Sequence, residues 1–376
     1  MLLRKALPIV LIVVLTLALA PATITGAQEE CAEMTPVRLQ LKWVTQAQFA
    51  GYYAAQEQGY WEAQCLEVEI LPGGPDIGPQ QVVASGGAEF GIDWIGSFLS
   101  FREQQGNVVN IAQIFQRSGM RELTWADSGL ETIEDLAGKV VGVWGFGNQF
   151  PLFAALVKND IDPNNPDDIT IFNQPFDMNA FLNREIDAAA AMTYNEMAQV
   201  LEFVGEDGTF PVYTMEDLNV IDLNEVGTAM LEDGIFVRED WLAEEGNEDI
   251  SVRFLKGAFQ GWIYCRDNSE DCVQYVLESG STLGEGHQRW MMNEINKLIW
   301  PSPNGIGLMD EALFDQTAEI ALNYEVITQP AGGEGESYRT DLAQAALDSL
   351  TMEMADLDLI GEDWEAAEVE ITPNGE

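Results

Sequence analysis

The most constraining feature of this sequence is a regular alternation of short strand-like and helix-like segments. Apolar residues with a period of two, or in short continuous runs, predict strands, whereas apolar residues spaced by one helical turn predict helices. Strands are expected at 37–43 and 107–116, within 66–74 before a turn at its Pro and Gly residues, and at the start of 88–96, and helices are expected at 49–61 and 79–87. A strand–helix–strand rhythm of this kind favours a mainly parallel sheet covered by helices, which is an α/β fold.

The same rhythm begins again after Gly129. The strand-like segments KVVGVWG, DDITIFNQ and DAAAAMT follow one another up to about residue 228. A further strand-like segment covers 229–240, and the pattern from there to the C-terminus is mostly helical. The sequence therefore divides into two similar α/β units followed by a helical region.

Two lobes joined by a hinge follow from this order, because the chain of 376 residues exceeds what one hydrophobic core usually serves. We expect residues 36–128 and 229–376 to form a discontinuous first lobe and residues 129–228 to form the second lobe. Crossings near 120–127 and 228–237 are expected to form the hinge, with a ligand cleft between the lobes.

Residues 1–27 have the features of a secretory signal peptide. A short basic start precedes an apolar stretch, and Thr25, Gly26 and Ala27 form a small-residue cleavage site. The apolar stretch is shorter than the roughly 20 residues that span a bilayer, and an uncleaved anchor is the alternative. Because no small apolar residues precede Cys31, we expect no N-terminal lipid. The protein is therefore expected to be exported, to the periplasm or outside the cell, near the cytoplasmic membrane.

Export also determines how the cysteines are interpreted. An even number of cysteines in an oxidising compartment suggests two disulfides, with free buried thiols as the alternative. The pairing cannot be deduced; proximity favours Cys265 with Cys272, and elimination leaves Cys31 with Cys65. The cysteines lack zinc spacing, and the single histidine, His287, is expected to be a solvated surface residue. No metal site is therefore expected.

The charge balance excludes two classes of partner. The chain has 17 Lys and Arg residues against 63 Asp and Glu residues, a net charge of −46. Such a surface repels nucleic acid and anionic lipid. The hydrophobic fraction of 47% is nevertheless that of a folded protein. We therefore expect a folded, acidic and monomeric protein whose ligand is a small molecule.

A polar cluster follows the buried run AAAAM at 188–192. Tyr194, Asn195 and Glu196 come directly after this predicted strand. The carboxyl ends of strands border the ligand crevice in open α/β sheets. We therefore expect these side chains at the cleft, and a solvent-facing turn without a ligand role is the alternative.

Several motifs, in this order, resemble those of the thiamine-pyrimidine precursor binding-protein family. They are LKWVTQAQFAGYYAAQEQGYW, LEVEI, EFGIDWIGS, AQIFQRS, LAGKVVGVWG, AMTYNE and EDGIFV, and they lie within residues 37–330. Within this family, the stretches YNE, FLKGAFQGWIYC and HQRWMMNEINKLIWPSPNGIG are similar to the riboflavin-binding, RibY-type branch.

The resemblance implies a two-lobed periplasmic binding protein of type II-like architecture, with a hinge and a cleft between the lobes. It further implies the extracytoplasmic solute-binding protein of an ABC importer, which binds riboflavin, delivers it to a permease, holds no cofactor and performs no catalysis. A thiamine pyrimidine precursor, hydroxymethylpyrimidine or formylaminopyrimidine, is the alternative ligand of the same fold.

Departures from the family pattern bear on these alternatives. Relatives that bind pyrimidine precursors carry Pro-Asn and a His in the first loop, whereas residues 44–49 read VTQAQF. An enzyme of the pyrimidine-synthase type is disfavoured because the chain lacks that histidine and the cysteine-rich motif. An anionic ligand would require arginines, for which Arg117 and Arg121 are the candidates.

A flavin ring requires aromatic faces for stacking and polar side chains that match its N–H and C=O groups. The expected aromatic contacts are Trp43, Tyr52, Trp94, Trp144 and Tyr194. The expected polar contacts are Gln48, Asp93, Gln116, Asn148, Asn195 and Glu196. Glu196 is expected to accept from a ligand N–H. For the three tryptophans the alternative is a place in the core, and for Asp93 it is the cap of a helix.

Overall fold

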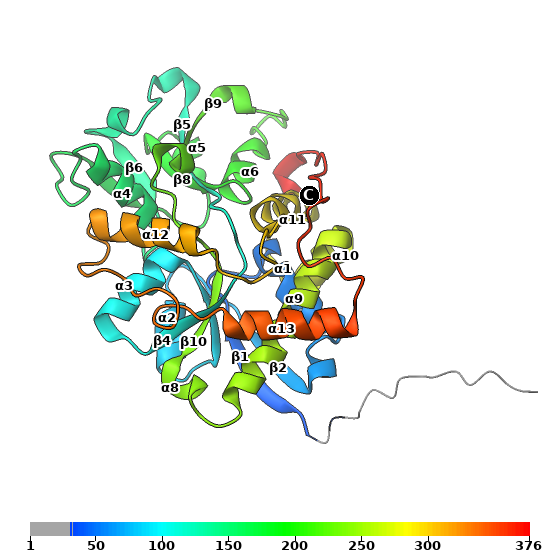
Figure 1. Cartoon of the computed structure of the whole chain (residues 1–376). Coiled ribbons are helices and arrows are strands. Elements are labelled where there is room, and N and C mark those ends of the chain that lie inside the picture. Colours follow the sequence, from blue (N-terminus) through cyan, green and yellow to red (C-terminus); the bar gives the residue numbers. More distant parts are fainter. Residues whose placement is uncertain (1–30, 32) are drawn as a thin grey trace, which may run out of the picture. The chain divides into compact units, whose positions relative to one another are not determined.

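Two five-stranded sheets organise the part of the chain that the computed structural model describes, residue 31 and residues 33–376 (Figure 1). The first sheet contains β1 (Thr35–Gln40), β2 (Leu66–Leu71), β3 (Phe90–Asp93), β4 (Val108–Gln113) and β10 (Gly234–Arg238). The second contains β5 (Met120–Trp125), β6 (Val140–Val143), β7 (Thr170–Asn173), β8 (Ala188–Met192) and β9 (Leu218–Asp222). The expected signal peptide, residues 1–27, lies outside the described residues.

The two sheets have the same topology. Their strand orders are β2-β1-β3-β10-β4 and β7-β6-β8-β5-β9. In the first sheet only β10 runs antiparallel to its neighbours β3 and β4, and in the second only β5 runs antiparallel to β8 and β9. The predicted mainly parallel sheets are therefore confirmed, each with one reversed strand.

The reversed strands arise because the chain changes sheet twice. Residues 114–119 lead from β4 in the first sheet to β5 in the second, and residues 227–233 lead back to β10 in the first. Because β5 pairs with β8 and β9, residues 120–125 belong with the second sheet, earlier than the boundary at 129 that the sequence analysis assigned. We call the first sheet with its helices the first lobe, and the second sheet with its helices the second lobe.

Helices cover both sheets. They are α1 (Ala50–Glu57), α2 (Pro79–Ala84), α3 (Ile95–Gln105), α4 (Phe150–Lys158), α5 (Asn179–Leu182), α6 (Glu196–Leu201), α7 (Leu223–Val226), α8 (Glu239–Leu242), α9 (Asn247–Asp267), α10 (Ser269–Glu278), α11 (Glu285–Ile299), α12 (Glu311–Asn323) and α13 (Asp341–Glu353). The last five bear out the helical pattern expected after residue 240. None of the helices among the described residues has the length and apolarity that crossing a membrane requires.

A close helix crossing fixes the start of α1. A Cβ atom on Gly51 would lie 2.2 Å from the Trp262 ring, and one on Gly261 would lie 1.9 Å from the Gly51 carbonyl oxygen. Glycine at both positions therefore allows α1 and α9 to pack with their backbones nearly in contact. This contact anchors the loop at residues 41–49, which precedes α1 and carries several of the predicted site residues.

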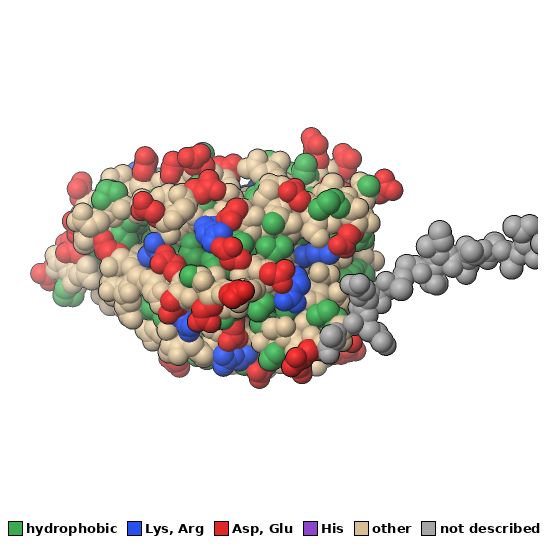
Figure 2. All heavy atoms as spheres, turned by 60° about the horizontal axis from the view of Figure 1, so that its bottom comes forward, with side chains coloured by type: hydrophobic (Ala, Val, Ile, Leu, Met, Phe, Trp, Pro, Cys, Tyr) green, Lys and Arg blue, Asp and Glu red, His purple; other side chains and the backbone are tan. Residues whose placement is uncertain are grey.

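The described cysteines are all oxidised. Cys265 and Cys272 form a disulfide between α9 and α10, as the sequence predicted, and Cys31 and Cys65 are also disulfide-bonded. Figure 2 shows that Asp and Glu side chains outnumber Lys and Arg side chains on the visible face, as the composition requires.

Candidate functional site

One cavity lies where the two lobes meet, and strands of both sheets end at it. Residues lining it follow the carboxyl ends of β1, β3, β6 and β8. The lining residues are Lys42, Trp43, Gln46, Gln48, Trp94, Trp144, Asn148, Met192, Tyr194, Asn195 and Glu196. The location obeys the rule that ligands of open α/β sheets bind beyond the carboxyl ends of the strands.

Most of the predicted site residues meet at this cavity. Those that line it are Trp43, Gln48, Trp94, Trp144, Asn148, Tyr194, Asn195 and Glu196. Three others lie behind it or elsewhere: Tyr52, Asp93 and Gln116. Tyr52 packs edge-on against Trp262, Asp93 binds Lys42, and the Gln116 amide nitrogen donates to backbone carbonyls of Gln113 and Leu308. These three side chains support the surroundings of the cavity and do not line it.

Sequence reasoning missed Lys42, Gln46 and Met192 as lining residues. Each of the three is adjacent to, or two residues from, a predicted site residue. The position near a strand end that identified the predicted residues could therefore have identified these three as well. It also missed Asp233, which does not line the cavity but holds two side chains that do. Asp233 is separated from Trp94 by 139 residues, and no local pattern marks that contact.

The first-lobe wall of the cavity contains a buried ion pair. Lys42 Nζ lies 2.5 Å from Asp93 Oδ1, and both side chains are almost fully buried. Ser97 Oγ also donates to Asp93 Oδ1 at 2.6 Å, and Lys42 Nζ sits 5.2 Å from the centroid of the Trp94 ring. Asp93 is therefore committed to Lys42 and Ser97, which explains why it lies outside the cavity.

Asp233 anchors the other side chains of this wall. Its Oδ1 accepts from Trp94 Nε1 at 2.9 Å and its Oδ2 accepts from Gln48 Nε2 at 3.0 Å. Gln48 Oε1 in turn accepts from Gln46 Nε2 at 2.7 Å. Burial raises the pKa of Asp233 to about 6, against the opposing effects of these hydrogen bonds and of Lys42. The carboxylate is therefore largely ionised at neutral pH and acts as an acceptor.

The second-lobe wall is built around Glu196. Its Oε2 accepts from the Met192 backbone N–H at 3.0 Å, and its Oε1 accepts from Asn195 Nδ2 at 2.8 Å. Burial raises the pKa of Glu196 to about 8, although these hydrogen bonds oppose the shift. The side chain is therefore mostly protonated and neutral at pH 7, and it can donate a hydrogen bond as well as accept one.

His287 contributes to this wall from behind, and its predicted place at the surface is wrong. The ring is only 1% exposed. Its Nδ1 lies 2.7 Å from Glu202 Oε2 on the turn that ends α6, and its Nε2 lies 3.0 Å from Asn195 Oδ1. The polar residues next to His287 in the sequence suggested that its side chain is exposed to solvent. A residue on a helix can, however, face a second helix across the junction of the lobes. His287 thus ties α11 to the residue that precedes Glu196.

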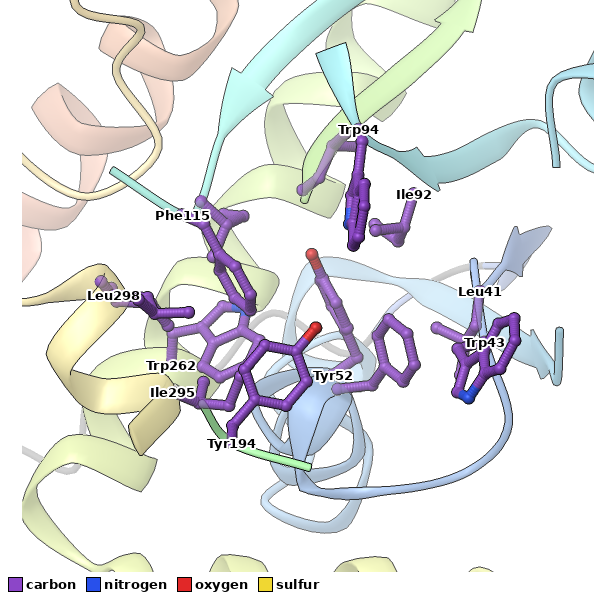
Figure 3. Close-up of a cluster of buried hydrophobic side chains, with 14 of the residues drawn as sticks. Leu41, Trp43, Tyr52, Ile92, Trp94, Phe115, Tyr194, Trp262, Ile295 and Leu298 are labelled. Atoms are coloured by element: carbon purple, nitrogen blue, oxygen red, sulfur yellow. The ribbon is translucent and has the colours of Figure 1, made fainter. Parts of the chain in front are cut away.

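An aromatic cluster fills the region beneath the cavity. Phe115, in the segment 114–119 that joins the two sheets, packs edge-on against Tyr194 and Trp262, with ring centroids 6.4 and 6.5 Å apart. Figure 3 shows Tyr52, Tyr194 and Phe115 converging from different elements, with the hydroxyl oxygens of Tyr52 and Tyr194 on the side of Trp94. The cluster makes the floor of the site continuous between the two lobes.

The lobes touch directly beside the cavity. A Cβ atom on Gly147, in the loop after β6, would lie 2.1 Å from Ser97 Cβ on α3. Gly147 also has a φ of +91°, a conformation that favours glycine. The cavity has a volume of about 30 Å³, room for about two water molecules. A ring-sized ligand therefore requires the lobes to part at this contact.

The two arginines considered for an anionic ligand do not line the cavity. The Arg117 guanidinium donates to the backbone carbonyls of Leu298, Trp300 and Pro301. Arg121 forms an ion pair with Asp222 at 3.1 Å. Among the lining residues, Lys42 is the one formal cation, and Asp93 neutralises it.

Comparison with known proteins agrees with this architecture. The profile of the NMT1/THI5-like family matches residues 46–271, which is more than half of the chain. The chain belongs to the NMT1/THI5-like family. This membership confirms the family that the sequence motifs resembled.

Similar proteins include two binding proteins of known ligand. The chain is 22% identical to a formylaminopyrimidine-binding protein of Halalkalibacterium halodurans, over 68% of this chain and 73% of that protein. It is 24% identical to the riboflavin-binding protein RibY of Chloroflexus aurantiacus, over 86% of this chain and 93% of that protein.

A solved structure shows the same fold. The periplasmic aliphatic sulphonate-binding protein SsuA of Escherichia coli superposes with a TM-score of 0.56 at 13% identity, covering 89% of this chain and 94% of that one. The two-lobed periplasmic binding protein fold is thereby confirmed.

Proposed function

We propose that this protein is the extracytoplasmic solute-binding component of an ABC importer, and that its ligand is riboflavin or a closely related flavin. The observation that carries the proposal is the composition of the cavity. Three tryptophans and one tyrosine, drawn from both lobes, surround it together with four carboxamide side chains. A flat heterocycle with polar edges is the class of ligand that such a wall suits.

The hydrogen-bonding atoms of the wall favour a ligand that donates. Gln46 Oε1 and Asn148 Oδ1 are buried and have no hydrogen-bond partner among the described residues. Leaving a buried acceptor unpaired costs about 1–3 kcal/mol, so a ligand N–H or O–H at each atom would stabilise the complex. The N3–H group and the ribityl hydroxyls of riboflavin provide such donors.

The charges of the wall favour a neutral ligand. Lys42 is neutralised by Asp93, and Glu196 is mostly protonated at pH 7. A sulfonate would have to be buried against a site without a free cation, at a large desolvation cost. The similarity to a sulphonate-binding protein therefore extends to the fold and is not proposed to extend to the ligand.

The ligand is proposed to be bound and released without chemical change. Residues of both lobes contact the same cavity, and Gly147 and Ser97 touch only when the lobes are close together. A ligand that contacts both walls selects the closed form, which is the form that a permease can distinguish from the open one. Most of this chain aligns with RibY, which supports the flavin.

A pyrimidine precursor is the second candidate ligand. The observation that favours it is the small volume of the cavity, about 30 Å³. The cavity would have to expand less to hold a single ring than to hold the three rings of a flavin. An aminopyrimidine also supplies N–H donors to Gln46 and Asn148. The relative that binds formylaminopyrimidine supports this alternative.

Fluorescence titration distinguishes the two ligands. Trp43, Trp94 and Trp144 line the cavity, so a bound ring should quench their emission. We expect saturable quenching by riboflavin at sub-micromolar concentration and none by formylaminopyrimidine. Quenching by formylaminopyrimidine alone would assign the pyrimidine instead, and no response to either compound would refute both ligands.

A further inference from the structure

Asp233 lies outside the cavity, yet two hydrogen bonds connect it to side chains that line it, and a third extends the chain to Gln46. Trp94 Nε1 donates to one carboxylate oxygen and Gln48 Nε2 donates to the other. Gln46 Nε2 then donates to Gln48 Oε1. Asp233, Gln48 and Gln46 are each at most 3% exposed, so water does not compete for these bonds.

The ionised carboxylate of Asp233 determines which group donates and which accepts in each hydrogen bond of this chain. An ionised carboxylate can only accept, so Gln48 must turn its NH₂ group toward Asp233. The carbonyl oxygen of Gln48 then faces Gln46, which must present its own NH₂ group. The remaining polar atom, Gln46 Oε1, is left without a partner among the described residues.

From this geometry we propose that Asp233 is a positioning residue that sets the hydrogen-bond polarity of the first-lobe wall, so that Gln46 accepts and the ligand must donate to it. The inference rests on the proposed function only for the identity of the ligand. It assigns a role in ligand selection to a residue of the second crossing, which the lining of the cavity alone does not reveal.

The second-lobe wall presents the same polarity by a separate contact. Asn148 Nδ2 donates to the Gly145 carbonyl oxygen at 2.8 Å, which leaves Asn148 Oδ1 unpartnered. Each lobe therefore offers one buried amide oxygen. A ligand with donors for both oxygens satisfies both walls at once, whereas a ligand with acceptors at these positions leaves both oxygens unpaired.

The variant Asp233→Asn tests the proposal because it should reverse the chain. Because Trp94 Nε1 can only donate, the amide oxygen of the new asparagine must accept its hydrogen bond. The NH₂ group of the asparagine then faces Gln48. Gln48 and Gln46 must then both turn over, and Gln46 presents NH₂ to the cavity. We expect the affinity for riboflavin to fall about tenfold or more, because an acceptor has become a donor.

A matched control and a double-mutant cycle separate positioning from general damage. Glu122→Gln changes an equally buried carboxyl of β5 that does not line the cavity, and it should leave the riboflavin affinity within about twofold. In a Gln46→Met background, Asp233→Asn should cost less affinity than it does in the wild type, because the atom through which it acts is gone. Equal costs in both backgrounds would overturn the proposal.

Side-chain amide exchange in the ligand-free protein tests the same inference without a ligand. The Gln46 NH₂ signals, assigned by their loss in Gln46→Met, should be protected from exchange in the wild type and should lose that protection in Asp233→Asn. If Asp233→Asn does not fold, Gln48→Met breaks the chain at its middle and should have the same effect. If the Gln46 NH₂ group stays protected from exchange in the variant that folds, the inference is overturned. If neither riboflavin nor formylaminopyrimidine binds the wild type, only the proposed function is refuted.

Discussion

The two walls of the cavity are held in different ways. The first-lobe wall is ionic: Lys42 and Asp93 form a buried pair, and the Asp233 carboxylate anchors Trp94 and Gln48. In the second-lobe wall, Glu196 is mostly protonated, and its partners are an amide and a backbone N–H. The first-lobe side chains are therefore held by charged groups, whereas Glu196 is held by neutral hydrogen bonds.

This difference indicates how the lobes divide the task of binding. A buried ion pair locks side-chain positions but is costly to disturb. We infer that the first lobe presents a preformed surface and that the second lobe completes the site on closure. Variants in the two walls should therefore behave differently.

Breaking the ion pair should have the largest effect. Lys42→Met leaves Asp93 buried with Ser97 as its remaining hydrogen-bond partner, and it should lower the free energy of unfolding by about 3–5 kcal/mol. Arg184→Met breaks the exposed pair with Asp127 and is the matched control, expected to cost less than about 1 kcal/mol. Urea unfolding measures both, and equal costs would show that the first-lobe wall is not held by its charges.

The tryptophans of the two walls should differ in their contribution to affinity. The Trp94 indole donates to Asp233 and has Lys42 Nζ over its ring, whereas the Trp144 N–H makes one longer contact of 3.3 Å to Pro175 O. Trp94→Ala should weaken riboflavin binding by about 2–3 kcal/mol and Trp144→Ala by about 1–2 kcal/mol. Calorimetric titration measures both values. If Trp94→Ala lowers thermal stability while the affinity holds, Trp94 is a core residue.

The contact between the lobes can be tested at a single atom. Gly147→Ala places a methyl group where Ser97 lies, so closure should be impaired and riboflavin affinity should fall by about 1–2 kcal/mol. Gly129→Ala is the matched control, because Gly129 has a similar positive φ, +71° against +91° at Gly147, and a Cβ atom there would have no neighbour within 4 Å. Both variants should lose similar stability, and only Gly147→Ala should lose affinity. Equal affinities would mean that closure at Gly147 is not part of binding.

The smallest effect at neutral pH is expected for Glu196→Gln. Glutamine resembles the protonated carboxyl, so riboflavin affinity at pH 7 should change by less than about 1 kcal/mol. A larger loss would show that Glu196 binds the ligand as an ionised carboxylate.

The pH dependence of stability gives the same test in another form. The pKa of Glu196 is about 8 in the folded protein against 4.5 ordinarily, so the folded state binds the extra proton between these values. Its contribution to stability is fully present below pH 4.5 and is lost as the pH rises to about 8. Glu196→Gln should make the decline from pH 5 to pH 8 shallower by up to about 1.4 kcal/mol per pH unit. An unchanged profile would contradict the assignment of a neutral Glu196.

Much of the fold could be predicted because its signals are local. The buried run at 188–192 and the alternating pattern at 66–71 each form the strand that the period predicts. The boundary between the lobes could not be placed correctly, since β5 follows the first crossing and its membership of the second sheet depends on pairing with β8 and β9. The pairing of strands that are distant in the sequence does not produce a periodic pattern of apolar residues.

The same distinction applies to the site. Trp43, Trp94, Trp144 and Tyr194 each lie just beyond a strand, so the strand-end rule finds them. Asp93 and Gln116 obey the same local rule, but Asp93 pairs with Lys42, Gln116 donates to the Leu308 carbonyl oxygen, and neither side chain lines the cavity. The buried position of His287 depends on Glu202 and Asn195, which are at least 85 residues away. Tertiary partners decide which strand-end side chains reach the ligand.

Backbone hydrogen exchange, measured with and without saturating riboflavin, shows whether one ligand is held between both walls of the cavity. We expect increased protection in both segments of the first-lobe wall, 42–49 and 93–97, and in both segments of the second-lobe wall, 144–149 and 192–197. Protection of one wall alone, or of a region away from the cavity, would contradict this expectation.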